Sequence, residues 1–322
     1  MHILITGGLG YIGSNISNWL IGNHVIHILD DFSSKAYTSF FNLKRKNVIF
    51  HHRKIHDYYY LIRLFEEYKI ELVIHLAAKK NITESLKYPA KYIYENHHGT
   101  MSLIKAMIEQ NVRNLIFSST AAVYMESEQK VNENSRIAIN NAYSQSKLRS
   151  EEFIKQNRQH FDNSIILRYF NPAGSDSNFK FGEDIINSET LFSNITKSLI
   201  SGKVFEIYGD DYNTPDGSCV RDIINIKDLC SAHEKIINNI NKKTGFNIFN
   251  IGTEYGVSVK MVADEINKIM PRQLKYKITK RRPNDISYSL SCSKKFKKTY
   301  DWKIKYWLNE TCIEVLKFNK VL

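Results

Sequence analysis

The stretch Thr6-Gly7-Gly8-Leu9-Gly10-Tyr11-Ile12-Gly13 decides the fold of this chain. It directly follows an apolar run, His2–Thr6, and it opens a helical pattern, Ile12–Ile21. Its glycines fit GxGxxG when counted from position 8 and the wider GxxGxxG when counted from position 7. Glycines at these places permit a tight turn and a close backbone approach. A pyrophosphate can therefore rest on the amino end of the following helix.

The next strand pattern, Val25–Asp30, ends in an acid 17 residues after Gly13. A carboxylate at this strand end can accept hydrogen bonds from both ribose hydroxyls of a dinucleotide, and it repels a 2′-phosphate. The glycine stretch and Asp30 together therefore predict a site for NAD rather than NADP.

Strand and helix patterns alternate through the first half of the chain. Such alternation indicates parallel βαβ units and an α/β fold with a doubly wound parallel (Rossmann) sheet. The expected strands are His2–Thr6, Val25–Asp30, Val48–His52, Leu72–Leu76, Leu115–Ser118 and Ser164–Arg168. The expected helices are Ile12–Ile21, Tyr58–Tyr68, Tyr92–Glu109 and Tyr143–Gln159.

The alternation ends at about Asn171, where NPAGSDSNFKFGED predicts a long polar loop. We expect an NAD-binding domain over residues 1–172. A smaller C-terminal α/β domain over residues 173–322 should cover the ligand edge of the sheet, with segments that cross back to the first domain.

The chain has 322 residues, 43% of them hydrophobic, and a net charge of +12 (45 basic minus 33 acidic). The basic residues are spread along the chain, and KKFKK (Lys294–Lys298) is the one dense cluster. Spread charge suits small polyanionic ligands and gives no one-sided footprint for nucleic acid. No apolar run reaches the ~18 residues of a membrane span. We therefore expect neither a nucleic-acid nor a membrane partner.

The four cysteines are scattered without a CxxC pair, and no secretory signal precedes the first strand pattern. This argues against a disulfide framework or a zinc site and favours a reducing cytoplasm. The histidines of HHRKIH (His51–His56) and the pair His97/His98 lack partners at ligand spacing. We expect them to be solvated or strand-end residues and expect no metal.

The candidate catalytic residues are Tyr143 and Lys147, at the start of one helical pattern, and Thr120, just past a strand. Residues four apart share a helix face, so the Lys147 ammonium should lie beside the Tyr143 phenol. A nearby ammonium, helped by the positive charge of a nicotinamide, should lower the pKa of Tyr143 and make it a general base. The same spacing recurs at Tyr276/Lys280, where no glycine stretch or hydroxyl-bearing strand precedes it.

These segments resemble the extended short-chain dehydrogenase/reductases, most closely the UDP-glucose (UDP-galactose) 4-epimerases, over nearly the whole chain. The most specific stretch is YGDDYNTPDGSCVRDIINIKDLCSAH (Tyr208–His233), which is similar to the family's GxDYxTxDGxxVRDxIHVxDLxxAH. Shorter matches stand in family order: LRYFNPAG (Leu167–Gly174), NIFNIGTEYGVSV (Asn247–Val259) and RRPND (Arg281–Asp285).

The resemblance implies an isomerase that interconverts C4 epimers of UDP-hexoses with tightly bound NAD, and a homodimer formed by the helices at Tyr92–Glu109 and Tyr143–Gln159. It assigns Tyr143 as the base, Lys147 as its partner and Thr120 as the catalytic hydroxyl. The implied NAD contacts are Gly7, Gly10, Tyr11, Ile12, Asp30, Lys80, Asn96, Ser118 and Tyr169. The implied UDP-sugar contacts are Asn171, Arg221, Arg282 and Asp285. The two arginines suit a diphosphate, because guanidinium groups bind phosphate oxygens in pairs.

The chain departs from the family pattern at several positions. Lys54 stands near the place of an adenine-binding Asp, and Met125 replaces a Gly. Leu191, in the loosely matching NSETLF (Asn187–Phe192), stands where a polar sugar contact is usual. Ser289 falls on a pocket position that varies between large and small in the family. A small residue there is associated with N-acetylated hexoses.

Three other functions were weighed against this one. A 4,6-dehydratase needs an additional acid/base pair, and the aligned Ala121 and Ala122 cannot transfer protons. A UDP-uronate epimerase, or another enzyme that modifies sugar nucleotides, stays open as the alternative. A non-catalytic NAD-sensing or nucleic-acid-binding protein could lose the Tyr/Lys pair, which this chain retains.

Overall fold

A computed structural model describes residues 1–33, 37–186, 188–282 and 285–322. Its chain forms two compact units built from interleaved segments. Unit 1 comprises Met1–Val123, Ile139–Arg168 and His233–Phe249, and unit 2 comprises Tyr124–Ala138, Tyr169–Ala232 and Asn250–Leu322.

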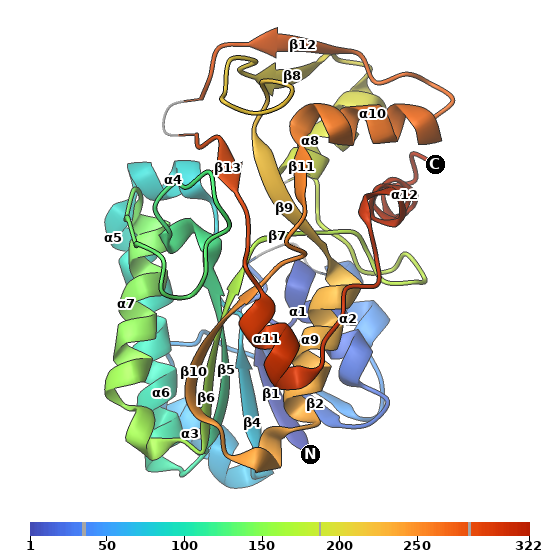
Figure 1. Ribbon diagram of the computed structural model, residues 1–322. Coiled ribbons are helices and arrows are strands. Elements are labelled where there is room, and N and C mark those ends of the chain that lie inside the picture. The colour runs from blue at the N-terminus through green and yellow to red at the C-terminus, as the bar shows by residue number, and fades with distance from the viewer. Residues whose placement is uncertain (34–36, 187, 283–284) are drawn as a thin grey trace. The chain divides into compact units, whose positions relative to one another are not determined.

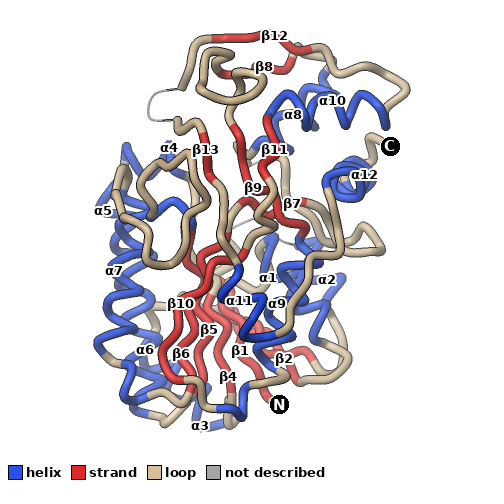
Figure 2. The backbone as a smooth tube through the Cα atoms, viewed as in Figure 1, coloured by secondary structure: helices blue, strands red, loops and turns tan. Residues whose placement is uncertain are grey.

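The sheet of unit 1 has seven strands in the order β10-β6-β5-β4-β1-β2-β3 (Figures 1 and 2). The pairs β1·β2, β2·β3, β1·β4 and β4·β5 are parallel, so the predicted doubly wound α/β fold is confirmed. The strands are β1 (His2–Thr6), β2 (Val25–Asp30), β3 (Val48–His52), β4 (Leu72–His75), β5 (Asn114–Thr120), β6 (Asn163–Tyr169) and β10 (Gly245–Ile251).

Helices cover this sheet, and three of them, α3, α6 and α7, lie side by side on one face (Figure 1). Apolar side chains of these helices and of β1, β4 and β5 form one buried core. Three consecutive residues of β1, Ile3, Leu4 and Ile5, are completely buried, as expected for a parallel strand covered on both faces. The helices are α1 (Tyr11–Leu20), α2 (Tyr37–Leu43), α3 (Tyr58–Tyr68), α4 (Ile82–Lys87), α5 (Pro89–Tyr92), α6 (Gly99–Glu109) and α7 (Ala142–Gln156), with short turns at η1 (Ile93–His98), η2 (Ala121–Val123), η3 (Arg158–His160) and η4 (Ile240–Lys242).

Unit 2 is built around β9, which pairs in parallel with β7 and β13 and antiparallel with β11, while β8 pairs with β12. Helices α8, α10 and α12 contribute to its apolar core. The strands are β7 (Asn171–Ala173), β8 (Phe205–Tyr208), β9 (Val220–Asn225), β11 (Gly256–Ser258), β12 (Tyr276–Thr279) and β13 (Tyr288–Ser289). The helices are α8 (Leu191–Ser201), α9 (Ile226–Ile237), whose last turn belongs to unit 1, α10 (Val259–Ile269), α11 (Lys294–Tyr300) and α12 (Leu308–Phe318).

The predicted polar loop after Asn171 is wrong in part. Its first residues form β7, and Phe181 is buried. Asp176 accepts hydrogen bonds from the backbone N–H groups of Lys180 and Phe181 at 2.6 and 2.7 Å, which folds the loop into a tight turn. The segment is polar because its side chains satisfy its own backbone, not because it is solvated throughout.

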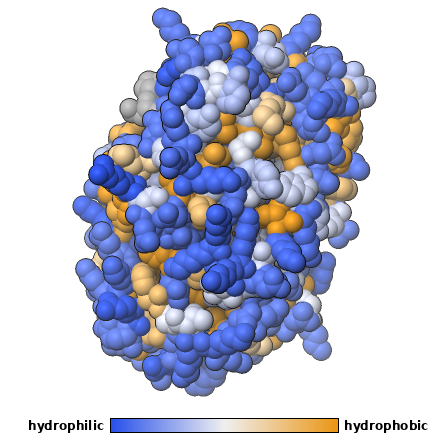
Figure 3. All heavy atoms as spheres, viewed as in Figure 1, coloured by the Kyte–Doolittle hydropathy of each residue, from blue (hydrophilic) through white to orange (hydrophobic). Residues whose placement is uncertain are grey.

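The basic cluster KKFKK lies in α11, where Phe296 is completely buried between exposed or half-buried lysines. Figure 3 shows hydrophilic side chains predominating over the face in view, with hydrophobic ones between them. Among the described residues, no helix combines the length and the apolar character needed to cross a bilayer.

Candidate active site

The glycine stretch forms a tight turn between β1 and α1. Gly7 has a φ of +68°, and a Cβ there would lie 2.8 Å from the Ala77 Cα atom. A Cβ at Gly13 would lie 2.2 Å from the carbonyl oxygen of Gly7. No side chain larger than hydrogen fits at either place. Helix α1 begins at Tyr11 without a side-chain cap and without an acid in its first turn, so its N–H groups can receive an anion.

Asp30 lies at the carboxyl end of β2, directly beside this turn. Its carboxylate accepts hydrogen bonds from the backbone N–H groups of Leu9 at 3.1 Å and Phe32 at 2.9 Å. Burial raises the pKa of Asp30, while these two hydrogen bonds act in the opposite direction. The turn and the acid are thus joined, and the residues present fit the pyrophosphate and ribose of a dinucleotide.

Asn96, a predicted cofactor contact, is almost completely buried and joins two other segments of unit 1. Its side-chain oxygen accepts from the N–H of Lys79 at 2.7 Å. Its amide donates to the Lys79 carbonyl at 3.0 Å and to the Ser146 hydroxyl of α7 at 2.9 Å. Lys80, the next residue, is exposed. Asn96 therefore fixes the segment after β4 to α7.

A π-helical turn, η1, gives Asn96 this orientation, and it interrupts the predicted single helix Tyr92–Glu109. The N–H of Gly99 reaches back five residues to the Tyr94 carbonyl, which also lies 3.0 Å from the Nε2 atom of His56. The imidazole of His56 stacks on the Tyr94 ring, 4.6 Å between centroids. One wider turn shifts the face that the following residues present, a feature often found at functional sites.

Tyr143 and Thr120 meet at the carboxyl end of β5. Tyr143 is the second residue of α7, whose first turn is capped by the Asn141 side chain, and the Thr120 hydroxyl bonds to the Tyr143 phenol. Burial raises the pKa of Tyr143, and the bond to Thr120 opposes this shift. The prediction that this pKa is lowered included the positive charge of a bound nicotinamide, and it stays a prediction. Burial outweighs the polar contacts, and additional positive charge is needed to produce a phenolate.

Lys147 points at β5. Its ammonium donates to the Ser118 carbonyl at 2.7 Å and lies 4.9 Å from the centre of the Phe117 ring. Burial lowers the pKa of Lys147 to about 7. The Ser118 hydroxyl donates to the His75 carbonyl at 3.0 Å. The structure thus brings Thr120, Tyr143, Lys147 and Ser118 together, with the ammonium anchored on the strand.

His75 was not predicted from the sequence, although it connects three parts of the cofactor half. The Thr100 hydroxyl donates to the Asn96 carbonyl at 2.7 Å, so it must accept from His75 Nε2–H at 2.9 Å. His75 Nδ1 then accepts from the Thr6 hydroxyl at 2.7 Å. Burial holds the pKa of His75 well below its usual range, consistent with this neutral form. The chain of bonds ties the end of β1 to the turn that carries Asn96.

The predicted nucleotide contacts of unit 2 gather around β9. Arg221 forms an ion pair with Asp285 at 2.5 Å and donates to the carbonyls of Val220 and Ile286, both at 2.9 Å. The Arg282 guanidinium lies 3.9 Å from the centre of the Tyr208 ring. Arg221 is therefore held by contacts within its own unit, and Arg282 is exposed and rests on an aromatic face.

Ser289 of β13 stands opposite Arg221 in the sheet register, and Asn171 of β7 stands opposite Ile223. The Asn171 amide donates to the Asp222 carbonyl at 3.0 Å. Tyr169 ends β6 and is buried. Leu191 packs against the apolar core of unit 2. Pro283 and Asn284 of RRPND and Asn187 of NSETLF lie outside the described residues.

The histidines of HHRKIH and the pair His97/His98 lie as strand-end or partly exposed residues. His51 and His52 end β3, where His51 is buried with its Nε2 3.1 Å from His27 Nδ1 of β2, and His52 and His98 are exposed. Within the described ranges, no group of three or more His, Cys, Asp or Glu side chains could hold a metal ion.

Comparison with known proteins places these observations in context. Residues 3–252 match the model of the NAD dependent epimerase/dehydratase family. The UDP-glucose 4-epimerase of Halalkalibacterium halodurans is 34% identical over 319 residues, 98% of this chain and 94% of that protein. A UDP-glucose 4-epimerase structure from Stenotrophomonas maltophila with bound NAD and formylated UDP-arabinopyranose is 28% identical, with a TM-score of 0.93 over 99% of this chain and 98% of that one. The UDP-Glc/GlcNAc 4-epimerase of Campylobacter jejuni is 32% identical, with a TM-score of 0.85 over 100% and 99% of the two chains.

Proposed function

Because the chain belongs to the NAD-dependent epimerase/dehydratase family, we propose that it interconverts UDP-glucose and UDP-galactose, using tightly bound NAD. The observation that carries this proposal is the meeting of Thr120, Tyr143 and Lys147 at the end of β5, beside a glycine turn and Asp30 that fit NAD. Relatives that are matched over nearly their whole length carry the same name.

In this reaction Tyr143 takes the proton of the sugar 4-hydroxyl and later returns it. NAD, when bound, would supply reversible hydride transfer at C4 of the sugar, which allows the hydride to be replaced on the other face. Thr120 orients the phenol, and the Lys147 ammonium stabilises the phenolate. Gly7, Gly10, Tyr11, Ile12 and Gly13 would hold the pyrophosphate through backbone N–H groups. Asp30 would hold the ribose, and Lys80, Asn96, Ser118 and Tyr169 the nicotinamide half.

Unit 2 would hold UDP while it leaves the hexose free to turn over. Arg221 and Arg282 supply fixed positive charge for a diphosphate, and Asp285 can accept from a ribose hydroxyl. Asn171 would contact the sugar or its phosphate from β7. Firm anchoring of the nucleotide and few contacts with the sugar suit an enzyme that must present both faces of one carbon.

We also propose that N-acetylated hexoses are substrates. Ser289 lies in β13 opposite Arg221 in the sheet register, and its side chain is small. The C. jejuni relative that covers nearly the same length is named for both UDP-Glc and UDP-GlcNAc.

We propose that two copies form a homodimer through α6 and α7. The proposed sequence boundary between the NAD-binding and UDP-sugar-binding domains lies at residue 172. The proposed place of action is the cytoplasm. Met101 of α6 is a partly exposed apolar residue that a second copy could cover. All four cysteines are free thiols, which suits a reducing compartment. Sedimentation of the purified protein at several concentrations tests the dimer.

The decisive experiment follows the conversion of UDP-galactose and of UDP-N-acetylgalactosamine by purified protein, with UDP-glucuronate as a third substrate. Tyr143→Phe should lower kcat at least about 10²-fold, because the proton acceptor is lost, while bound NAD and the unfolding midpoint stay unchanged. Turnover near the wild-type rate in Tyr143→Phe would refute the mechanism. If the protein converts UDP-glucuronate and neither of the other two sugars, the substrate is a UDP-uronate and not a UDP-hexose.

A further inference from the structure

A buried ion pair lies directly behind the catalytic lysine. Glu151 follows Lys147 by one helical turn in α7, and its side chain is 3% exposed. Arg168 of β6, 2% exposed, approaches it with two parallel contacts, Nε–Oε1 at 3.0 Å and Nη2–Oε2 at 2.6 Å. This geometry fixes the carboxylate in orientation as well as in place.

A third group completes this arrangement, because the Ser119 hydroxyl donates to the Glu151 carboxylate. Ser119 stands in β5 between Ser118, which accepts from the Lys147 ammonium, and Thr120, which bonds to Tyr143. Side chains alternate along a strand, so Ser119 faces away from Thr120. A bond at Ser119 therefore fixes the orientation of both neighbours.

Resting on the function proposed above, we propose that Glu151 is a positioning residue for the reaction. Clamped by Arg168, its carboxylate fixes the end of β5 through Ser119, and it keeps Lys147 charged next to Tyr143. Glu151 does not touch the reacting atoms, and it acts through the groups that do.

The electrostatic part of this role depends on all the groups that face Lys147. Tyr143 and Glu151 flank it on α7, the Phe117 ring faces it from β5, and His75 of β4, which is neutral, lies close enough to feel its charge. Burial lowers the pKa of Lys147 to about 7, and the charge of Glu151 opposes that shift. Without this charge the ammonium loses its proton at lower pH. The active form, a charged lysine beside a phenolate, then persists over a narrower range.

Glu151→Gln tests this role because glutamine keeps the shape and removes the charge. We expect the alkaline limb of kcat/KM for UDP-galactose to move by about one pH unit or more toward acid. We expect kcat at pH 8 to fall about tenfold or more, with bound NAD retained. Ser119→Ala separates the two parts of the role. It should lower kcat by about threefold without moving the limb, because the charge remains.

Glu314→Gln is the matched control. Glu314 is also a buried carboxylate, 7% exposed and paired with Lys227, but it belongs to unit 2. This variant should keep the wild-type pH profile. A wild-type alkaline limb in NAD-bound Glu151→Gln overturns the proposal. If Glu151→Gln does not fold, Glu151→Asp is the test, because aspartate keeps the charge on a shorter side chain. This variant should keep the alkaline limb of kcat/KM and have a lower kcat. A wild-type kcat in Glu151→Asp would overturn the proposal. A wild-type protein that converts no UDP-hexose refutes the proposed function instead.

Discussion

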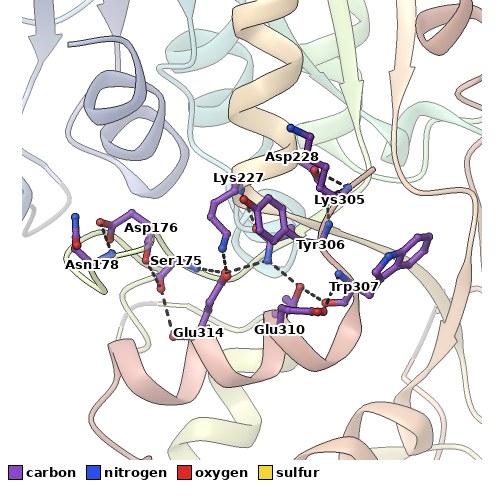
Figure 4. A network of polar contacts seen from close by, with 12 residues as sticks. Ser175, Asp176, Asn178, Lys227, Asp228, Lys305, Tyr306, Trp307, Glu310 and Glu314 are labelled. Atoms are coloured by element: carbon purple, nitrogen blue, oxygen red, sulfur yellow. Dashed lines mark hydrogen bonds and ion pairs between the residues drawn. The ribbon is translucent and has the colours of Figure 1, made fainter. Parts of the chain in front are cut away.

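Each unit of the molecule buries a carboxylate–cation pair, and the two pairs differ in what surrounds them. In unit 1, Glu151 and Arg168 meet between α7 and β6, and Ser119 of the catalytic strand joins them. In unit 2, Glu314 of α12 pairs with Lys227 of α9, whose ammonium lies 3.8 Å from the centre of the Tyr306 ring (Figure 4). Both pairs join a glutamate carboxylate to a basic side chain, a guanidinium in unit 1 and an ammonium in unit 2, and both are largely buried.

The neighbours of Glu314 are structural groups. Its carboxylate accepts from the Asn225 amide at 2.9 Å and from the Ser175 backbone N–H at 3.2 Å, which ties α12 to β9 and to the loop after β7 (Figure 4). The neighbours of Glu151 are the groups that hold Lys147 and Thr120. A buried pair therefore gains a role from the strand that it touches, and equal substitutions in the two pairs should give unequal losses of activity.

The largest expected effect comes from removing the cation of each pair. Arg168→Met and Lys227→Met each leave a buried carboxylate unpaired, and such losses cost about 3–5 kcal/mol of unfolding free energy. Arg168→Met should also lower kcat at least about tenfold, whereas Lys227→Met should leave the kcat of the folded fraction within about twofold.

Urea unfolding measures the stability loss in both variants, and hydrogen exchange resolved by peptide assigns it to unit 1 or unit 2. Lys155→Met, at an exposed site of α7, is the control, with a change below about 0.5 kcal/mol. Equal losses of kcat in the two cation variants would show that the comparison has no functional meaning.

A second difference between the units concerns acid. In unit 1, His2, His27 and His51 form a row across β1, β2 and β3, with N···N distances of 3.1 Å for both steps. His51 also lies 2.7 Å from the Tyr60 hydroxyl. Burial lowers the pKa of His27 to about 3 and that of His51 to about 4. His27 and His51 are therefore neutral at pH 7, and their burial depends on their remaining so.

Acidification should destabilise unit 1 through this row. Between pH 6.5 and about 4 the unfolded chain binds protons that His27 and His51 do not bind in the folded chain, so the unfolding free energy falls as the pH falls. At ~1.4 kcal/mol per unit, His51 alone accounts for about 3 kcal/mol. Nearby Glu67 opposes the shift of the pKa of His51. His51→Gln should flatten the dependence of stability on pH below 6.5. An unchanged slope would exclude the row as its source.

The sequence predicted the groups whose roles depend on local order. A glycine turn between a strand and a helix, Asp30 at a strand end, and Thr120 before the Tyr143/Lys147 helix were identified because each signal lies within a few residues of the chain. The structure places the glycine turn between β1 and α1, Asp30 at the end of β2 and the Tyr/Lys pair in α7, and it extends the strand by two residues, so that Thr120 is the last residue of β5 and not just past it.

What the sequence did not show depends on pairing between distant segments. Glu151 in a charged helix looks like a solvated residue until β6 brings Arg168 against it. The π-helical turn before Gly99 changes the helical period over one turn only, too briefly for a periodicity to register. The sequence placed the Lys147 ammonium beside the phenol, and it did not show that this ammonium also donates to the Ser118 carbonyl, because a distant strand supplies that acceptor.

The smallest expected effect concerns Asp228 and the different pH dependence of stability in the two units. In unit 2, Asp228 accepts from the backbone N–H groups of Lys305 and Tyr306 at 3.1 and 3.0 Å, and burial raises its pKa to about 6 (Figure 4). Between pH 3.8 and about 6 the folded unit binds more protons than the unfolded chain, so Asp228 makes stability fall as the pH rises. This dependence is opposite to that of the histidine row.

Asp228→Asn should therefore remove the loss of unfolding free energy that unit 2 shows as the pH rises. The loss of unfolding free energy of unit 1 in acid should be unchanged. At pH 7 relief of the buried charge and loss of one acceptor for a backbone N–H nearly cancel, so we expect a change of about 1 kcal/mol or less. Hydrogen exchange of unit 2 peptides at pH 4.5 and 7 measures both quantities. If the peptides of α9 and α12 in Asp228→Asn keep the wild-type pH dependence, Asp228 titrates at its ordinary value and is not the source of the difference between the units.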